Sequence, residues 1–367
     1  MKIGILGTRG IPNAYGGFEQ FAQYLAEGLT AKGHDVSVYN SSTHPYKQDN
    51  WMGIKLIHCK DWEDNIGTAG QFVYDFNCLK DAAKRNFDIL LQLGYTSNSI
   101  WFPIWPKKSI NIVNMDGMEW KRSKYNRLTK KFLRLAESWA VKHADVLVSD
   151  SKGIQNYILE KYQEPSVYIP YGADIPSSID TAILTEWDLQ PYQYYLLMAR
   201  MEPENNIEMI IRGYLDSERN FPLILIGNPG NEFGKLMAKK YPHPMVRFIG
   251  AIYKQDAVNN LRYYSSIYFH GHSVGGTNPS LLEAMACKCN IAAHDNIFNR
   301  AILEDNASYF NSDADVRDII NLQAPADVLD NRKDNNLEKI KTSYKWSKIV
   351  DDYERLFLEP EKFLKNK

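Results

Sequence analysis

The stretch Gly275–Asp295, GGTNPSLLEAMACKCNIAAHD, combines a glycine pair, a helix start and a short β-like run. Asn278 is a favourable helix cap, and Pro279 is a favourable first helical residue. Apolar residues dominate as far as Ala286, and Asn290–Ala293 is then apolar enough for a strand that is buried on both faces. A loop, a helix and a strand in this order are typical of a parallel α/β sheet, so the stretch predicts an α/β fold.

The same alternation of strand and helix runs through the whole chain. In the first half, strands are predicted at Lys2–Leu6, Asp35–Tyr39, Asp88–Leu93, Ile110–Asn114, Asp145–Ser149 and Ser166–Ile169. In the second half they are predicted at Tyr194–Ala199, Pro222–Gly227, Val246–Gly250, Ile267–His270 and Asn290–Ala293. Helical periodicity marks Gly17–Lys32 and Ile207–Leu215, among others.

The length of 367 residues suits two domains of about 150–200 residues each. The proline-containing stretch Pro170–Pro191 separates the two alternating halves. We therefore expect a first Rossmann-like domain over residues 1–175 and a second over 176–345, with a helix in 346–367 that packs back on the first domain. Two such doubly wound domains would face each other across a cleft, and ligands bind at the carboxyl ends of parallel strands.

The composition excludes several classes of protein. A net charge of −1 provides no basic field for nucleic acid. Four cysteines are too few for a disulfide framework, which favours a cytoplasmic location, and Cys287 and Cys289 are interpreted as buried thiols and not as metal ligands. No apolar run approaches the roughly 18 residues of a membrane span, so any membrane contact would be peripheral.

The second half carries two motifs directly after predicted strands. Arg200 follows the strand Tyr194–Ala199, where a guanidinium suits a diphosphate, although pairing with Glu202 or Glu204 is the alternative. Gly275 and Gly276 allow close approach of a ligand, and the helix after Thr277 and Asn278 directs its amides at an anion. Glu283 lies among apolar neighbours, so its carboxylate needs a partner, and it could accept from a ribose diol.

The first half carries two further motifs. Gly7–Gly17 is a glycine-rich loop containing Arg9 and Tyr15, and Gly16 and Gly17 open a helix with free amides. Asp116 and Glu119 in MDGMEW are candidates for binding sugar hydroxyls or receiving a proton, with Trp120 beside them. The basic run that follows predicts either a solvated face or a patch for anionic lipid; its residues are Lys121, Arg122, Lys124, Arg127, Lys130, Lys131 and Arg134.

Two other patterns have structural interpretations. His270 and His272 end a predicted strand near the expected cleft. Either could contribute to the site, but hydrogen-bonded histidines are the favoured interpretation. Asp313 and Asp315 resemble an Asp-x-Asp metal motif, but their position predicts a helix cap instead.

Taken together, these residues resemble glycosyltransferase family 4, whose members have the GT-B fold and retain anomeric configuration. The second half carries the resemblance through YLLMARMEPENN, PLILIG, VRFIGAIY and GGTNPSLLEAMA. The first half, through TRGIPNAYGGFEQF and NMDGMEWKRSKYN, is similar to the branch that contains bacterial rhamnosyltransferases of surface-polysaccharide assembly.

The resemblance implies roles for individual residues. Arg200 would bind the diphosphate, Glu283 the ribose, Gly16 and Gly17 the donor phosphates, and Ile249, Gly250 and Ala251 would border the nucleobase. Arg9, Tyr15, Asp116, Glu119 and Trp120 are assigned to the acceptor or sugar side. Two departures stand out, because Gly275 occupies the place of the family's first glutamate and Asn205 that of its lysine. Asp116 stands near the position of a histidine that many members carry.

The implied function is metal-independent transfer of a hexose from a nucleotide-sugar, dTDP-rhamnose first and a UDP-sugar second, to a glycan. The acceptor would be carried on a polyprenyl diphosphate at the inner membrane face, with peripheral contact to anionic lipid. No separate cofactor is expected. Three alternatives stay open: a nucleotide-sugar 2-epimerase, a non-catalytic nucleotide-sugar-binding protein, and a nicotinamide-dependent oxidoreductase. The last is weakest because the Gly7–Gly17 loop lacks G-x-G-x-x-G spacing.

Overall fold

A computed structural model describes residues 1–14, 16–122, 125–218 and 221–365. Two residues singled out in the sequence, Tyr15 and Lys124, lie outside the described residues. The chain divides into two compact units. Unit 1 comprises Met1–Tyr171 with Trp346–Lys367, and unit 2 comprises Gly172–Lys345.

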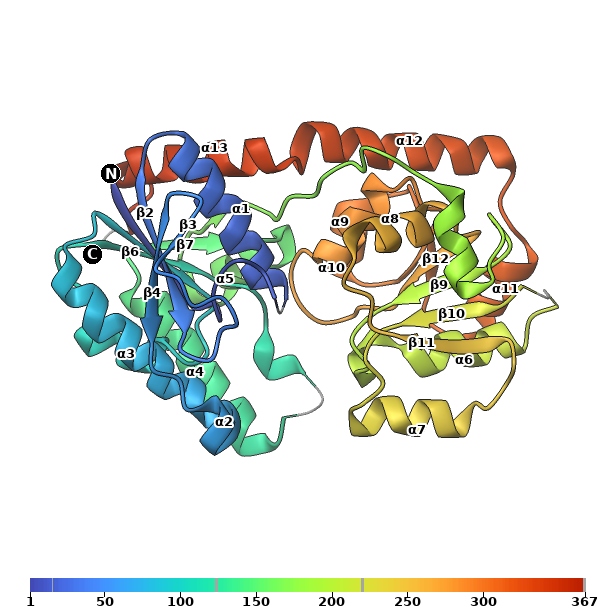
Figure 1. The fold of residues 1–367 in the computed structure, drawn as a ribbon, viewed down its shortest axis with the longest axis horizontal. Helices are drawn as coiled ribbons and strands as arrows, with labels where there is room; N and C mark the ends of the chain where they lie inside the picture. Colours follow the sequence, from blue (N-terminus) through green and yellow to red (C-terminus); the bar gives the residue numbers. More distant parts are fainter. Residues whose placement is uncertain (15, 123–124, 219–220, 366–367) are drawn as a thin grey trace. The chain divides into compact units, whose positions relative to one another are not determined.

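Unit 1 is built on an eight-stranded sheet in the order β3-β4-β2-β1-β5-β6-β7-β8 (Figure 1). Among the described residues, only the pair β3–β4 is antiparallel. The strands are β1 (Lys2–Leu6), β2 (Asp35–Ser41), β3 (Asn50–Trp51), β4 (Ile54–Cys59), β5 (Ile89–Leu93), β6 (Ile110–Asn114), β7 (Val146–Ser149) and β8 (Val167–Tyr168). The main helices are α1 (Gly17–Ala31), α2 (Glu63–Ile66), α3 (Gly70–Arg85), α4 (Arg127–His143), α5 (Lys152–Tyr162) and α13 (Trp346–Leu358).

The C-terminal helix α13 packs against α1 within unit 1. The rings of Tyr24 and Trp346 stack at 4.4 Å with an interplanar angle of 3°. Phe21 contacts Tyr353 at a ring distance of 5.4 Å. The apolar face of α13 is thus buried against the first helix of the chain, which explains why an amphipathic helix without a following strand is stable here.

Unit 2 has a six-stranded parallel sheet in the order β11-β10-β9-β12-β13-β14. Its strands are β9 (Tyr195–Met198), β10 (Leu223–Ile226), β11 (Val246–Gly250), β12 (Ile267–His270), β13 (Ile291–His294) and β14 (Ser308–Phe310). Its main helices are α6 (Ile207–Leu215), α7 (Glu232–Lys240), α8 (Gln255–Tyr263), α9 (Pro279–Ala286), α10 (Ile297–Leu303), α11 (Asp313–Asn321) and α12 (Ala326–Ser343). Figure 1 shows α8 and α9 on one side of this sheet and α6 and α7 on the other.

The core of unit 2 follows from the continuous apolar runs. Leu197 of β9 pairs with Leu225 of β10 and with Phe269 of β12, and all three side chains are fully buried. Ile207, Ile210 and Ile211 of α6 pack on the same cluster. A strand with helices on both faces buries every residue, and so these runs do not alternate.

The predicted strands are all present, whereas β3, β4 and β14 were not predicted. In β4, Lys55 and His58 interrupt the apolar pattern, and Lys55 is exposed and bonds Asp35 at 2.8 Å. β14 spans three residues, too few for a pattern to be recognised. Within Pro170–Pro191, the structure has a 3-10 helix, η4 (Thr181–Trp187), which belongs to unit 2.

Candidate functional site

Each sheet has one point where the order of its strands reverses direction, which we call the switch point. In unit 2 it lies between β9 and β12, because β10 and β11 continue to one side of β9 while β12 and β13 continue to the other. The loops after β9 and β12 leave the carboxyl ends of their strands at this point, which is where open α/β sheets bind ligands. Arg200 lies on the first of these loops, and Gly275 and Gly276 lie on the second.

The two loops approach each other through their backbones. A Cβ built on Gly271 would lie 1.9 Å from the carbonyl oxygen of Asn205. The Asn206 side-chain amide donates to the carbonyl of Gly271 at 2.7 Å, and Ser273 donates to the carbonyl of Glu204 at 2.7 Å. Only glycine fits at position 271, so this residue permits the close contact between the loops.

Arg200 has an exposed side chain at the carboxyl end of β9. Among the described residues it forms no ion pair, so Glu202 and Glu204 do not neutralise it as the alternative interpretation required. Asn205, in a short 3-10 helix on the same loop, is buried and donates from its amide to the Arg200 carbonyl at 2.7 Å. Its Oδ1 lies 2.9 Å from Nδ1 of His272.

Helix α9 begins as the sequence predicts. Asn278 is the cap, its side chain accepting from the amide of Ser280 at 2.9 Å, and Pro279 is the first helical residue. Thr277 before the cap is buried. Gly275 has φ +128°, a conformation that side-chain-bearing residues rarely adopt. The missing glutamate at this position therefore coincides with backbone that favours glycine.

Glu283 is held by Arg262 of α8, which the sequence analysis missed. The guanidinium Nη2 lies 2.6 Å from Glu283 Oε2, and the Arg262 side chain is 1% exposed. Burial acts to lower the pKa of Arg262, but the Glu283 carboxylate together with Tyr268, Cys287 and Cys289 outweighs burial, and the pKa is raised. Arg262 also donates to Ser280 Oγ at 3.0 Å. One signal was available: Arg262 stands four residues after buried Val258, on the apolar face of its helix.

Ile249, Gly250 and Ala251 lie at the end of β11, which is the edge strand next to β10. Gly250 has φ +83°. Two strands, β10 and β9, separate β11 from β12 in the sheet, so these three residues lie beside the switch point and not within it.

Of the two histidines at the end of β12, His272 is hydrogen-bonded to Asn205, as expected, and His270 differs from expectation. His270 is buried and its Nε2 has no hydrogen-bond partner among the described residues, so the interpretation of His270 as a satisfied histidine is wrong. Burial lowers its pKa well below the usual value, and nearby His272 and Arg262 lower it further. The desolvated ring is thus kept neutral.

In unit 1 the switch point lies between β1 and β5. The loop after β1 is anchored by Glu19 of α1, which accepts from Thr8 Oγ1 at 3.1 Å and from the Arg9 amide at 2.8 Å. The Arg9 guanidinium makes two hydrogen bonds to Glu63, at 3.0 and 2.5 Å. Gly16 caps α1 and Gly17 begins it, as the sequence predicts.

The segment after β6 carries the three other predicted residues of unit 1. Asp116 accepts from the Tyr171 hydroxyl at 3.0 Å, and Glu119 forms an ion pair with Arg122 at 2.8 Å. Trp120 donates from its indole to Glu137 of α4 at 2.9 Å. Glu137, a buried carboxylate that the sequence analysis did not identify, therefore anchors this segment.

The remaining patterns are structural. Cys287 and Cys289 are buried free thiols, and burial raises the pKa of Cys287 to about 12. Asp315 completes a capping box with Ser312 at the start of α11, as predicted. The described residues contain no group of three or more His, Cys, Asp or Glu side chains that could hold a metal ion.

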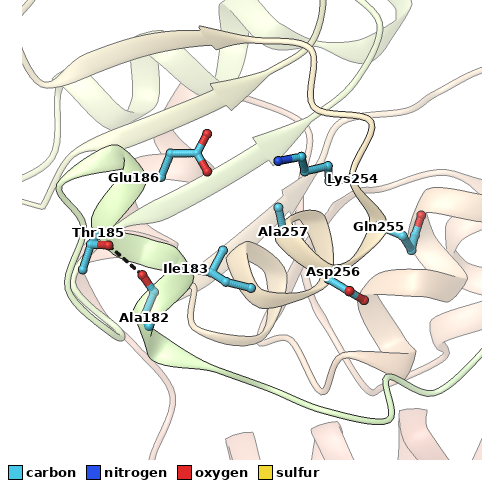
Figure 2. Close-up of a pocket in the computed structure, with 8 residues that line it drawn as sticks. All are labelled: Ala182, Ile183, Thr185, Glu186, Lys254, Gln255, Asp256 and Ala257. Carbon is cyan, nitrogen blue, oxygen red and sulfur yellow. Dashed lines mark hydrogen bonds between the residues drawn. The ribbon is translucent and has the colours of Figure 1, made fainter.

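An open cavity of about 660 Å³ lies between η4 and the start of α8, away from all the predicted site residues (Figure 2). Figure 2 shows Glu186 and Lys254 directed toward each other across it. Its other lining residues are Ala182, Ile183, Thr185, Gln255, Asp256 and Ala257.

Comparison with known proteins agrees with this arrangement. Residues 1–174 match a domain of unknown function (DUF1972), and residues 187–333 match glycosyl transferases group 1. An uncharacterized glycosyltransferase of Methanocaldococcus jannaschii is 24% identical over 372 residues, covering 92% of this chain and 93% of its own.

Among solved structures, sucrose-phosphate synthase from Thermosynechococcus elongatus superposes with a TM-score of 0.83 at 16% identity, covering 98% of this chain and 99% of its own. HepE of Anabaena, in complex with UDP and glucose, superposes with a TM-score of 0.75 at 14% identity, covering 98% and 99%. These structures show that the fold is GT-B. The similarity to glycosyl transferases group 1 lies in unit 2, over residues 187–333.

Proposed function

We propose that the chain is a retaining glycosyltransferase that moves a hexose, with rhamnose favoured, from a nucleotide-sugar to a glycan acceptor in surface polysaccharide biosynthesis. The observation that carries the proposal is Arg200 at the switch point of unit 2, which is exposed and has no ion pair within the described part of the chain. It lies on the loop that contacts the loop leading into α9. A cation and a helix N-terminus on adjoining loops are suited to a diphosphate.

The chemistry assigned to these residues is charge stabilisation. Arg200 and the amides at the start of α9 neutralise the charge that develops on the leaving diphosphate, which makes a metal ion unnecessary. The acceptor's proton passes to that diphosphate as the new glycosidic bond forms on the same face. Glu283, held in place by Arg262 at 2.6 Å, binds the ribose hydroxyls. Asp116 and Glu119 of unit 1 bind the acceptor or the transferred sugar.

Two donor sugars are considered, and a separate observation supports each of them. Position 275 has no side chain, which supports a donor sugar that does not need the family's first glutamate, and this favours dTDP-rhamnose. A UDP-sugar is the alternative, supported by the likeness to HepE of Anabaena, which was solved in complex with UDP-glucose.

A polyprenyl-diphosphate-linked acceptor would bring the protein to the inner face of a membrane. No helix among the described residues is long and apolar enough to cross one. On α4, Arg127, Lys131 and Arg134 are exposed next to Leu128, which is 80% exposed, and Leu135, which is 45% exposed. Exposed cations beside exposed leucines support peripheral contact with anionic lipid.

The experiment that tests the function is calorimetry without metal, with dTDP-rhamnose, UDP-glucose, UDP-GlcNAc, GDP-mannose and NADH as ligands. Tight binding of dTDP-rhamnose alone supports the rhamnosyltransferase assignment. Preference for a UDP- or GDP-sugar keeps the reaction and replaces the donor. Binding of none of the sugar nucleotides would contradict the assignment of the unit 2 switch point.

A further inference from the structure

Asn205 and His272 connect the two loops of the unit 2 switch point by a hydrogen bond whose direction can be deduced. The Asn205 Nδ2 atom donates to the Arg200 carbonyl at 2.7 Å, which leaves Oδ1 facing the His272 Nδ1 atom at 2.9 Å. A carbonyl oxygen only accepts, and so the His272 Nδ1 atom carries the proton. Asn205 is buried, which restricts its amide to this orientation.

The protonation of Nδ1 determines what the other ring nitrogen can do. In a neutral imidazole with a proton on Nδ1, the Nε2 atom carries a lone pair and accepts hydrogen bonds. This Nε2 borders Gly275, since a Cβ built on Gly275 would lie 3.1 Å from it. The Nε2 side of the imidazole thus lies beside a residue that has no side chain.

We propose that His272 Nε2 accepts a hydrogen bond from a hydroxyl of the sugar in the nucleotide-sugar donor, and that Asn205 is a positioning residue that sets the tautomer. The inference rests on the proposed function. Arg200, assigned to the diphosphate, is joined to this pair through its own carbonyl, and the sugar attached to that diphosphate is therefore the nearest source of hydroxyls. A neutral acceptor recognises the hydroxyl without adding a negative charge near the diphosphate.

The proposal also accounts for the two departures from the family together. Asn205 stands in the lysine's place and Gly275 in the glutamate's place, and His272 contacts the first by a hydrogen bond and lies against the second. The imidazole occupies space that the beginning of a side chain at position 275 would need. The lysine and the glutamate of the family are thus replaced by an amide and a glycine with an imidazole beside it.

The test is calorimetry on the full chain with UDP, dTDP, UDP-glucose and dTDP-rhamnose, without acceptor. We expect His272→Ala to raise the dissociation constant of the nucleotide-sugar by about three- to tenfold, because one neutral hydrogen bond is lost. The dissociation constant of the nucleoside diphosphate should not change. His272→Gln, which retains an acceptor oxygen, should recover part of the loss. His243→Ala, which changes an exposed histidine of the same unit, should behave as wild type.

The inference would be overturned if His272→Ala weakened the binding of the nucleoside diphosphate and of the nucleotide-sugar equally, or if it weakened neither. Wild-type protein that binds neither a nucleoside diphosphate nor a nucleotide-sugar would overturn the proposed function itself. Wild-type binding with an unaffected His272→Ala variant would overturn this inference alone.

The tautomer is tested separately by the ¹⁵N spectrum of the His272 ring in the intact chain. We expect a protonated Nδ1 and an unprotonated Nε2 in the wild type. Asn205→Leu should allow both tautomers, because it removes the oxygen that accepts from Nδ1. A wild-type ring protonated on Nε2 alone would overturn the assignment.

Discussion

Arg262 and Glu283 form an ion pair at 2.6 Å between α8 and the first turns of α9. The guanidinium is buried while the carboxylate is partly exposed. A buried cation without a counter-ion is costly, so the pair both stabilises unit 2 and determines the direction of the carboxylate.

Replacing Glu283 by Leu should lower the free energy of unfolding by about 3–5 kcal/mol, because it leaves the Arg262 charge buried without a partner. The double variant Arg262→Met/Glu283→Leu should recover most of this stability, since neither charge remains. Urea unfolding of the wild type, both single variants and the double variant measures the coupling. A loss below about 1 kcal/mol in Glu283→Leu would show that the pair contributes little.

Arg200→Ala should weaken donor binding or turnover by the equivalent of about 2–4 kcal/mol, because it removes the cation assigned to the diphosphate. Calorimetry and initial rates measure the two effects. Arg317→Ala, which changes an exposed arginine on α11 that pairs with Asp318, is the matched control and should have no effect. A change of less than about tenfold in both quantities would remove Arg200 from the site.

His270 should make the stability of the protein fall at acidic pH. Burial depresses its pKa in the folded state, so below the ordinary value near pH 6.5 the unfolded chain binds a proton that the folded chain resists. The contribution of His270 is therefore present above that pH and is lost as the pH falls, by up to about 1.4 kcal/mol per pH unit.

The measurement is the free energy of unfolding of the wild type and of His270→Gln at several pH values between 5 and 8. The variant should show a shallower decline toward acid. Exposed His243→Gln should follow the wild-type slope. Identical slopes for His270→Gln and the wild type would mean that the His270 pKa is ordinary.

Glu137 should be important for the stability of unit 1 and for the environment of Trp120. Its carboxylate accepts from Trp120 at 2.9 Å, and also from Tyr157, Lys161 and Tyr162 at 2.7, 2.7 and 2.6 Å. Glu137→Gln should cost about 1.5–3 kcal/mol, since these bonds go to a charged acceptor, and should shift the Trp120 fluorescence. Trp120→Phe removes a single donor and should cost less. Unchanged stability and emission in Glu137→Gln would count against the role of Glu137.

Much of the candidate site could be predicted from local sequence. The strand before Arg200 is continuous in apolar residues, and a parallel strand delivers the next residue to the ligand-binding edge of the sheet. Asn278 and Pro279 specify the start of α9 through their own backbone preferences. β4 was missed because Lys55 and His58 obscure its pattern, although β4 lies inside the unit 1 sheet and is paired on both sides.

The partners of these residues could not be predicted in the same way. The hydrogen bond of Asn205 to His272 spans 67 positions in the chain. It exists because β9 and β12 are neighbours in the sheet, although β10 and β11 lie between them in sequence. Likewise, Arg262 meets Glu283 because α8 and α9 pack side by side.

The sequence by itself therefore determined the α/β architecture, the ends of the strands, the cap of α9 and the position of Arg200, because each depends on hydrophobic pattern or backbone preference over a few residues. Only the tertiary structure decided that Glu283 is paired with Arg262 and that Asn205 orients His272 beside Gly275. It also decided that His270 is buried and that its Nε2 meets no hydrogen-bond partner in the part of the chain that the structure describes. These relationships depend on strand order and helix packing, which bring together side chains that no local pattern connects.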